Sequence, residues 1–167
     1  MIKQLAALAL AGSALLGCAS SAVAGDRLPF DETKINNLLE VVKETGHRVY
    51  RGGGPCDRLP AYGFATPTRR LVICVDNHKG DLVELGDTIR HEAFHLAQFC
   101  KARRVGATAA LIFPDRKGMM EEAIRLGMPV QHYQERQHAT EAEARVIAHE
   151  MDADQIAVIL EEECHHD

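Results

Sequence analysis

The cysteines that follow an export-type N-terminus constrain this chain more than any other feature. Residues 1–24 begin with one cation, Lys3, continue as an apolar stretch and end in small residues, which is the layout of a secretory signal. The apolar stretch is too short to span a bilayer. We therefore expect the mature chain to be exported, periplasmic or secreted, and to fold in an oxidising compartment where cysteines pair.

The signal contains two alternative cleavage sites, and the sequence does not decide between them. An A-x-A site ends at Ala24, whereas Leu-Leu-Gly-Cys over residues 15–18 resembles a bacterial lipoprotein box. In the second case the signal is 1–17, and Cys18 becomes a lipid-anchored first residue. Either route leaves a single domain, 25–167 when the signal ends at Ala24, without a transmembrane helix.

Both routes leave an even set of cysteines in the domain: Cys56, Cys74, Cys100 and Cys164. We expect two disulfides, and four cysteines allow three pairings between which the sequence does not choose. In one of the three, Cys56 pairs with Cys74 and clips a loop to a strand. The remaining pair would then join two helices.

The charge balance excludes one class of partner. The 167 residues include 19 Lys and Arg against 24 Asp and Glu, a formal net charge of −5. Because the longest basic run is Arg103-Arg104, there is no basic surface to hold a nucleic-acid backbone.

Hydrophobic periodicity predicts a small, helix-dominated α+β domain with a short antiparallel β-hairpin. Asp31 can cap a first helix that Gly46 ends, and residues 47–51 are β-prone. Residues 62–65 and 71–75 are typical of two strands joined by a turn.

Three further helices are expected after this hairpin. The first is capped by Asp87 or Thr88 and runs to about Arg104. The second covers about 115–126, and the third is one long helix that ends near Glu163.

The helix that ends near Arg104 contains His91 and His95, whose spacing puts two imidazoles one turn apart on the same face. On a helical projection the apolar residues gather on the opposite side: Ile89, Ala93, Leu96 and Cys100. The histidines should therefore face a cleft and converge on one cation. Glu92 lies beside them, where its carboxylate can take a proton from a water molecule instead of binding the metal.

His91-Glu92-x-x-His95 is the HExxH signature, and the chain resembles the zincin metallopeptidases. The resemblance implies a zincin-like domain with Zn²⁺ as cofactor and a peptide or protein as substrate. It also implies that His91 and His95 are metal ligands and that Glu92 is the general base of peptide-bond hydrolysis.

A hydrolytic zinc site needs a third protein ligand. The metzincin pattern fails, because Gln98 and Lys101 stand where it has a glycine and a third histidine. A glutamate from the last helix is the gluzincin solution. On a helical projection Glu141 borders the buried face, whereas Glu143 falls among solvated acids and fits a capping box with Thr140. We therefore prefer Glu141 to Glu143.

The segment Glu141-x-x-Ala144 resembles the E-x-x-A-D or E-x-x-A-N third-ligand segment of several gluzincin families. In those families the final Asp or Asn supports the metal site, whereas this chain has Arg145. The sequence thus leaves open which residue orients the ligand histidines, and Asp152 is one candidate. Tyr133 is a candidate donor to an oxyanion.

Two functions follow from these patterns. The first is an exported zinc-dependent metallopeptidase. The alternative is a non-catalytic exported binding module that keeps the zincin fold and uses the metal as a structural brace. Glu92 favours the enzyme, because a purely structural site has no need for a carboxylate there. The predicted hairpin is either plain core sheet or a strand that pairs with an extended substrate.

Overall fold

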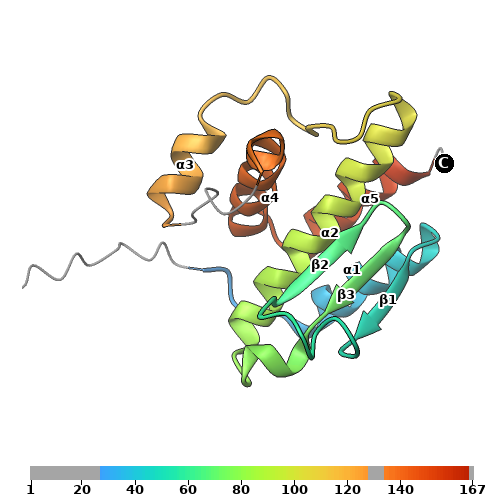
Figure 1. Ribbon diagram of the computed structural model, residues 1–167, viewed down its shortest axis with the longest axis vertical. Coiled ribbons are helices and arrows are strands. Elements are labelled where there is room, and N and C mark those ends of the chain that lie inside the picture. The colour runs from blue at the N-terminus through green and yellow to red at the C-terminus, as the bar shows by residue number, and fades with distance from the viewer. Residues whose placement is uncertain (1–26, 128–133, 166–167) are drawn as a thin grey trace, which may run out of the picture.

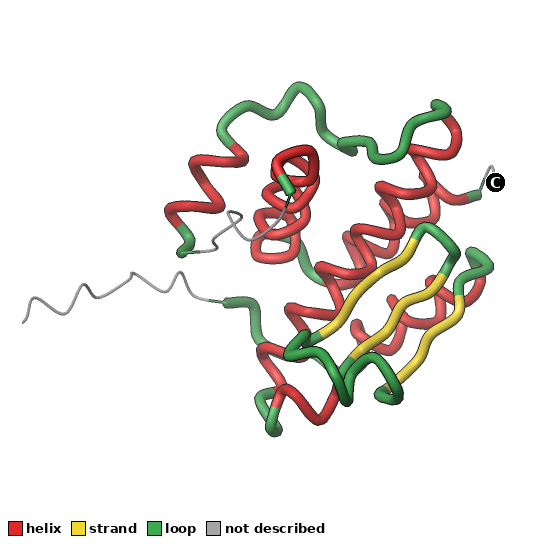
Figure 2. The backbone as a smooth tube through the Cα atoms, in the orientation of Figure 1, coloured by secondary structure: helices red, strands yellow, loops and turns green. Residues whose placement is uncertain are grey.

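A long central helix, α2 (Leu82–Arg104), separates a small sheet from a pair of helices. The sheet lies in front of α1 and beside α2, whereas α3 and α4 lie together on the other side of α2 (Figures 1 and 2). This computed structural model describes residues 27–127 and 134–165. The other elements are α1 (Glu32–Glu44), β1 (Arg48–Arg51), β2 (Gly63–Thr66), β3 (Arg70–Ile73), the 3₁₀ turn η1 (Val75–His78), α3 (Met119–Arg125), the 3₁₀ turn η2 (Glu135–Gln137), α4 (His138–Glu150) and α5 (Ala153–Cys164). The predicted helix-dominated α+β class is confirmed.

The sheet has three strands in the order β1-β3-β2. Strands β2 and β3 are antiparallel, with Phe64 opposite Val72, so the predicted hairpin is confirmed. Strand β1 pairs with the other edge of β3 in parallel, with Tyr50 opposite Val72. Because β2 is at the edge of the sheet and packs on α2, it forms one side of the space above that helix.

The main hydrophobic core lies between α1, α2, α5 and the inner strand β3. Its fully buried side chains include Leu38, Leu71, Phe94, Ile156 and Leu160. A second, smaller cluster of Ala123, Ala142 and Val146 joins α3 to α4. One face of α2 is therefore held in the main core, and its neighbouring face is turned toward α4.

Helix α2 begins earlier than the sequence predicted. Asp81, not Asp87 or Thr88, is its N-cap and accepts a hydrogen bond from the backbone N–H of Glu84 (3.0 Å). Gly86 lies inside the helix. Phe30 packs closely on this position, and a Cβ there would lie only 3.1 Å from Phe30 Cδ2, which favours glycine. Packing against Phe30 thus outweighs the low helix propensity of glycine.

The predicted last helix is two helices. Met151 is extended (φ −107°, ψ 137°), and Asp152 begins α5 in a capping box with Gln155. The Asp152 carboxylate also pairs with Lys34 at 2.6 Å. Asp152 therefore holds the start of α5 against α1, and its predicted place beside the metal ligands is wrong. Helix α3 is also shorter than expected and begins at Met119 instead of near residue 115.

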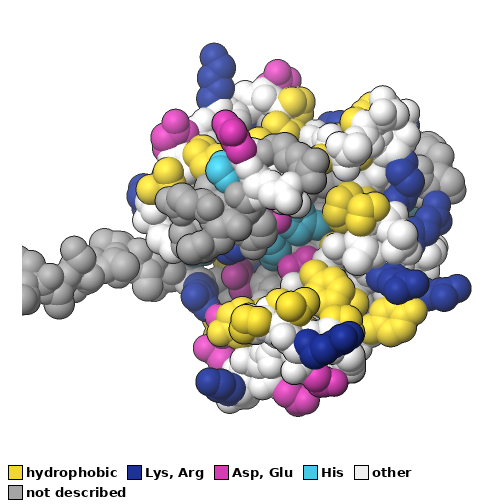
Figure 3. Space-filling model, in the orientation of Figure 1, with side chains coloured by type: hydrophobic (Ala, Val, Ile, Leu, Met, Phe, Trp, Pro, Cys, Tyr) yellow, Lys and Arg dark blue, Asp and Glu magenta, His cyan; other side chains and the backbone are white. Residues whose placement is uncertain are grey.

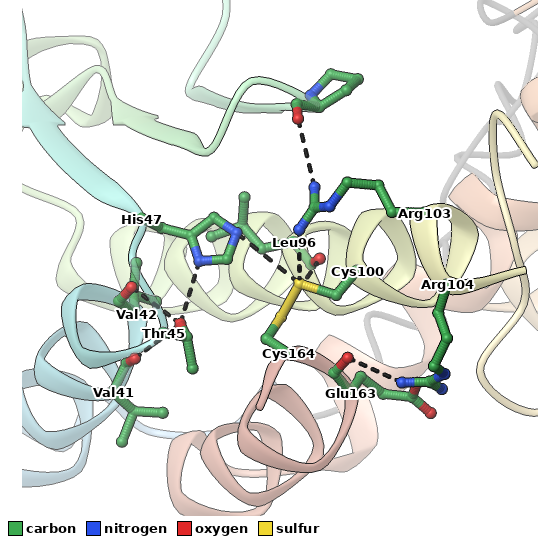
Figure 4. The surroundings of a disulfide bond; sticks show 11 residues. Val41, Val42, Thr45, His47, Leu96, Cys100, Arg103, Arg104, Glu163 and Cys164 are labelled. Atoms are coloured by element: carbon green, nitrogen blue, oxygen red, sulfur yellow. Dashed lines mark hydrogen bonds and ion pairs between the residues drawn. A yellow bond between two sulfur atoms is a disulfide. The ribbon is translucent and has the colours of Figure 1, made fainter. Parts of the chain in front are cut away.

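Two disulfides are present, as expected for an oxidising, exported environment. Cys56–Cys74 ties the loop after β1 to the end of β3, and Cys100–Cys164 joins α2 to α5 (Figure 4). The signal segment 1–24, with Cys18, lies outside the described residues. Within the described part of the chain, every helix is too short or too polar to cross a membrane.

Candidate metal centre

The side chains of His91, Glu92 and His95 line a cavity of about 490 Å³ beside α2. Figure 3 shows a hollow in the middle of this face, with histidine side chains in it and hydrophobic side chains next to it. The cavity lies between β2 on one side and the start of α4 on the other. The sequence prediction that the histidines face a cleft is confirmed.

Helix α4 brings Glu141 to the two histidines. The Nε2 atoms of His91 and His95 are 3.0 Å apart. The carboxylate of Glu141 lies 3.5 Å from His91 Nε2 through Oε2 and 3.3 Å from His95 Nε2 through Oε1. Three donor groups from two helices therefore converge at one point, all within 4.8 Å of one another.

The buried side chain of Arg90 fixes α4 against α2. Its Nε donates to the backbone carbonyl of Ala148 at 2.9 Å, and its guanidinium lies 3.3 Å from Asp87. This contact joins the residue next to His91 on α2 to the second half of α4. It therefore helps to fix the position of α4 relative to α2, and with it the position of Glu141 beside the two histidines.

Glu143, the alternative third ligand, lies elsewhere. Its side chain is 1% exposed, so the prediction that it is a solvated acid is wrong. The carboxylate accepts hydrogen bonds from the amide of Gln98 (2.7 Å) and from the backbone N–H groups of Ile112 (3.0 Å) and Phe113 (2.7 Å). The predicted capping box is also absent, since Thr140 lies within α4 and donates to the carbonyl of Gln137.

The geometry of the three groups fits a zinc ion. With ligand bonds of about 2.0–2.2 Å and tetrahedral angles, ligand atoms are separated by about 3.4 Å. Here the two histidine Nε2 atoms are 3.0 Å apart, and the carboxylate lies 3.5 Å from His91 Nε2 through Oε2 and 3.3 Å from His95 Nε2 through Oε1. In addition, Oε2 of Glu141 is buried and has only a weak contact with the ring of His91, 3.5 Å away, an arrangement that a cation would improve. Two imidazoles and a carboxylate are also a ligand set that zinc commonly takes in hydrolytic sites.

The charges at the site are coupled. Burial opposes ionisation of Glu141, but the hydrogen bonds and charges of His91 and His95 outweigh it and hold the pKa of this carboxyl well below its usual range. Burial likewise favours the neutral ring of His95, but Glu141 and Glu92 raise the pKa of that ring above 6.5. Glu141 therefore favours its ionised form, and the nearby carboxylates favour protonation of the His95 ring.

A glycine allows β2 to approach the centre of α2 closely. A Cβ at Gly63 would lie 2.9 Å from Thr88 Cγ2, 3.0 Å from the carbonyl oxygen of Val72 and 3.2 Å from Glu92 Cγ. The backbone of β2 thus packs directly on the Glu92 side chain. This contact helps to hold Glu92, a residue that is 8% exposed, at the wall of the cavity.

Sequence reasoning missed the roles of Arg90 and Gln98 around the site, and it placed Glu143 in solvent instead of in the interior. Arg90 and Gln98 are polar residues on a helix, and their burial depends on α4, which is distant in the sequence. The remaining predicted residue, Tyr133, lies outside the described residues. In comparisons with family models, curated proteins and solved structures, nothing matched the chain.

Proposed function

We propose that the protein is an exported zinc-dependent metallopeptidase with a zincin-like domain. The observation that carries the proposal is the convergence of His91, His95 and Glu141 beside a cavity whose wall contains Glu92. A structural zinc site takes four protein ligands, whereas three protein ligands and an open side are typical of hydrolytic sites. The two disulfides support a periplasmic or secreted location, with a lipid anchor at Cys18 if the lipoprotein site is used.

In this proposal His91, His95 and Glu141 hold Zn²⁺. When bound, the ion supplies a Lewis acid that polarises the scissile carbonyl and lowers the pKa of water. Glu92 takes the proton of the attacking water and later donates it to the leaving amine. Its position on the same helix, one residue from a ligand, keeps the base beside the reacting atoms without making it a ligand.

The shape of the site supports a peptide as substrate. Strand β2 is at the edge of the sheet, and its residues Gly63, Phe64 and Ala65 line the cavity beside Glu92. An edge strand offers backbone donors and acceptors to an extended peptide. A peptide paired with β2 would therefore lie along the cavity that His91, His95 and Glu141 also line.

The experiment that tests this function is cleavage of a peptide library by the zinc-loaded protein. We expect cleavage that a chelator abolishes and added zinc restores. The Glu92→Gln variant should keep its zinc and lose about 100- to 10,000-fold in cleavage rate, because it retains the shape of the side chain but not the base. Glu84→Gln, in the first turn of the same helix and outside the lining of the cavity, is the matched control and should remain active.

Two results would contradict the proposal. An equally active Glu92→Gln protein would exclude the general-base role. A protein that binds zinc stoichiometrically but cleaves no peptide of the library would favour the non-catalytic binding module instead.

A further inference from the structure

We propose that Gln98 is a positioning residue of the candidate zinc centre. Together with Glu143 it fixes the ring of His95 in the tautomer that leaves Nε2 available to a metal ion. The inference rests on the proposed zinc site but not on the proposed peptide substrate. We refer to the two hydrogen-bonded side chains as the Gln98–Glu143 bridge.

The contacts of Gln98 determine which way its amide points. One end of the amide lies 2.7 Å from a carboxylate oxygen of Glu143 and 3.1 Å from the backbone carbonyl of Thr140. Both partners are acceptors only, so the NH₂ group must face them. The amide oxygen of Gln98 therefore faces Nδ1 of His95, at 2.7 Å. A flipped amide would put its oxygen against two other oxygens.

This orientation in turn fixes the proton on His95. An amide oxygen only accepts, so Nδ1 must carry the hydrogen that is donated to it. A neutral imidazole with a proton on Nδ1 has its lone pair on Nε2. That same Nε2 lies 3.0 Å from His91 Nε2 and 3.3 Å from Glu141. When the ring is neutral, the Gln98 contact therefore directs the lone pair of Nε2 toward the side on which a metal would be held.

The far end of the bridge is anchored to the backbone. Glu143 is 1% exposed, and its carboxylate accepts the N–H groups of Ile112 and Phe113 as well as the Gln98 amide. Charge-assisted hydrogen bonds of this kind are what a buried carboxylate requires. Since Gln98 is itself 2% exposed, the bridge is held on both sides by packing.

The anchor also joins the metal centre to a wall of the cavity. Ile112 and Phe113 belong to the segment that follows α2, and its earlier residues Thr108 and Ala109 line the cavity. The bridge therefore holds a ligand ring and this wall in a fixed relation. In the gluzincin families that the chain resembles, an Asp or Asn after the alanine supports the metal ligands, whereas this chain has Arg145 after Ala144. We assign that supporting role to the Gln98–Glu143 bridge.

The direct test is the tautomer of His95 in the metal-free wild-type protein. Histidine ring nitrogens labelled with ¹⁵N report by NMR which nitrogen carries the proton, at a pH well above the pKa of this ring. We expect the proton on Nδ1. A proton on Nε2 would overturn the proposal, and this measurement needs neither a variant nor zinc.

A pair of variants separates positioning from stability. Gln98→Met keeps a long, buried side chain without the amide, and we expect zinc affinity to fall about 10- to 100-fold, as is usual when a supporting residue of a metal ligand is lost. The ring of His95 should then populate both tautomers. Leu96→Ala is the control, because Leu96 is fully buried on the same helix but makes no part of the bridge.

The control should lower stability and leave zinc affinity within about threefold of wild type, which is near the variation expected between contexts. Wild-type zinc affinity in Gln98→Met, or an equal loss in both variants, would overturn the positioning role. A wild-type protein that binds no zinc would instead contradict the proposed function, while the tautomer measurement would still decide the role of Gln98.

Discussion

Two groups of metal-ligating side chain types lie along α2, one nearer its middle and the other nearer its C-terminal end. The first is His91, His95 and Glu141, and the second is His47 with Cys100 and Cys164. In each group the potential ligand atoms lie within 4.8 Å of one another. By residue type and spacing alone, either group could be taken for a zinc site.

The chemistry of the two groups differs. In the second group both sulfurs are joined in a disulfide, and the His47 ring packs against it with Nε2 3.9 Å from Cys100 Sγ (Figure 4). The group is also buried in the core that joins α2 to α5, with Cys100 0% exposed. A thiolate is the ligand form of cysteine, so the disulfide removes this group as a metal site.

The first group has no covalent bond between its donor atoms, and its three residues line a cavity. The two parts of the helix therefore differ: its C-terminal part is covalently tied to α5, and its middle part lines a cavity. We therefore expect stability and zinc binding to depend on different residues.

The largest expected effect is on stability, from removal of the disulfide between α2 and α5. Cys100 and Cys164 are separated by 64 residues, and closing a loop of this size stabilises the folded state by about 4 kcal/mol. The double variant Cys100→Ala/Cys164→Ala should lose about that much free energy of unfolding, measured in urea. Cys56→Ala/Cys74→Ala, with a separation of 18, is the comparison and should lose about 3 kcal/mol.

Neither double variant should change the amount of zinc bound by folded protein at saturating zinc. If loss of the Cys100–Cys164 disulfide abolished zinc binding in protein that is still folded, the expectation that stability and zinc binding depend on different residues of α2 would be wrong.

The next effect is on zinc affinity, from loss of one ligand. If the binding energy of a protein zinc site, about 10–16 kcal/mol with four ligands, is shared between them, each ligand contributes about 3 kcal/mol. His91→Ala should therefore bind zinc at least about 100-fold more weakly. His47→Ala is the matched control, because His47 belongs to the other group. Competition with a chromophoric chelator measures both, and equal losses would contradict the comparison.

Features of the fold and site that depend on residues close together in the sequence could be predicted, and those that depend on distant contacts could not. The placement of His91, Glu92 and His95 on one face of a helix is set by local geometry, and the sequence predicted it. Glu141 was favoured by the same projection, applied to the part of the last helix that is helical. The start of α2 was missed because Gly86 indicates a loop unless Phe30 is known to pack on it.

The environment of Glu143 could not be predicted for a similar reason. A helical projection separates the faces of one helix, but which face is buried depends on what packs there. Here the segment containing Ile112 and Phe113 folds over α4 and donates two backbone N–H groups to Glu143. Such contacts link residues about thirty positions apart, and no local pattern encodes them.

The smallest effect is a difference in pH dependence between the metal-free and zinc-loaded forms. Because the pKa of His95 is raised, its contribution to the stability of the metal-free protein is complete below pH 6.5 and is lost as pH rises through the raised value. The lowered pKa of Glu141 acts at the other end, since its contribution is complete above pH 4.5 and is lost as pH falls toward the lowered value.

Zinc binds the unprotonated ring, so the stabilisation by zinc should increase as pH rises above 6.5. Over that range the His95 contribution to the metal-free protein should fall, with a slope of at most about 1.4 kcal/mol per pH unit for one proton. Unfolding in urea at two pH values above 6.5, with zinc and with chelator, measures both trends. A stabilisation by zinc that does not change with pH would exclude His95 as a ligand.

The central claim is that zinc occupies one of the two groups on α2 and not the other. Anomalous diffraction at the zinc edge, from crystals of the oxidised protein grown with zinc, tests it most directly. We predict one strong peak within bonding distance of His91 Nε2, His95 Nε2 and the Glu141 carboxylate, and none beside His47. A peak at His47, or no peak at the His91–His95–Glu141 group in zinc-soaked crystals, would contradict the account.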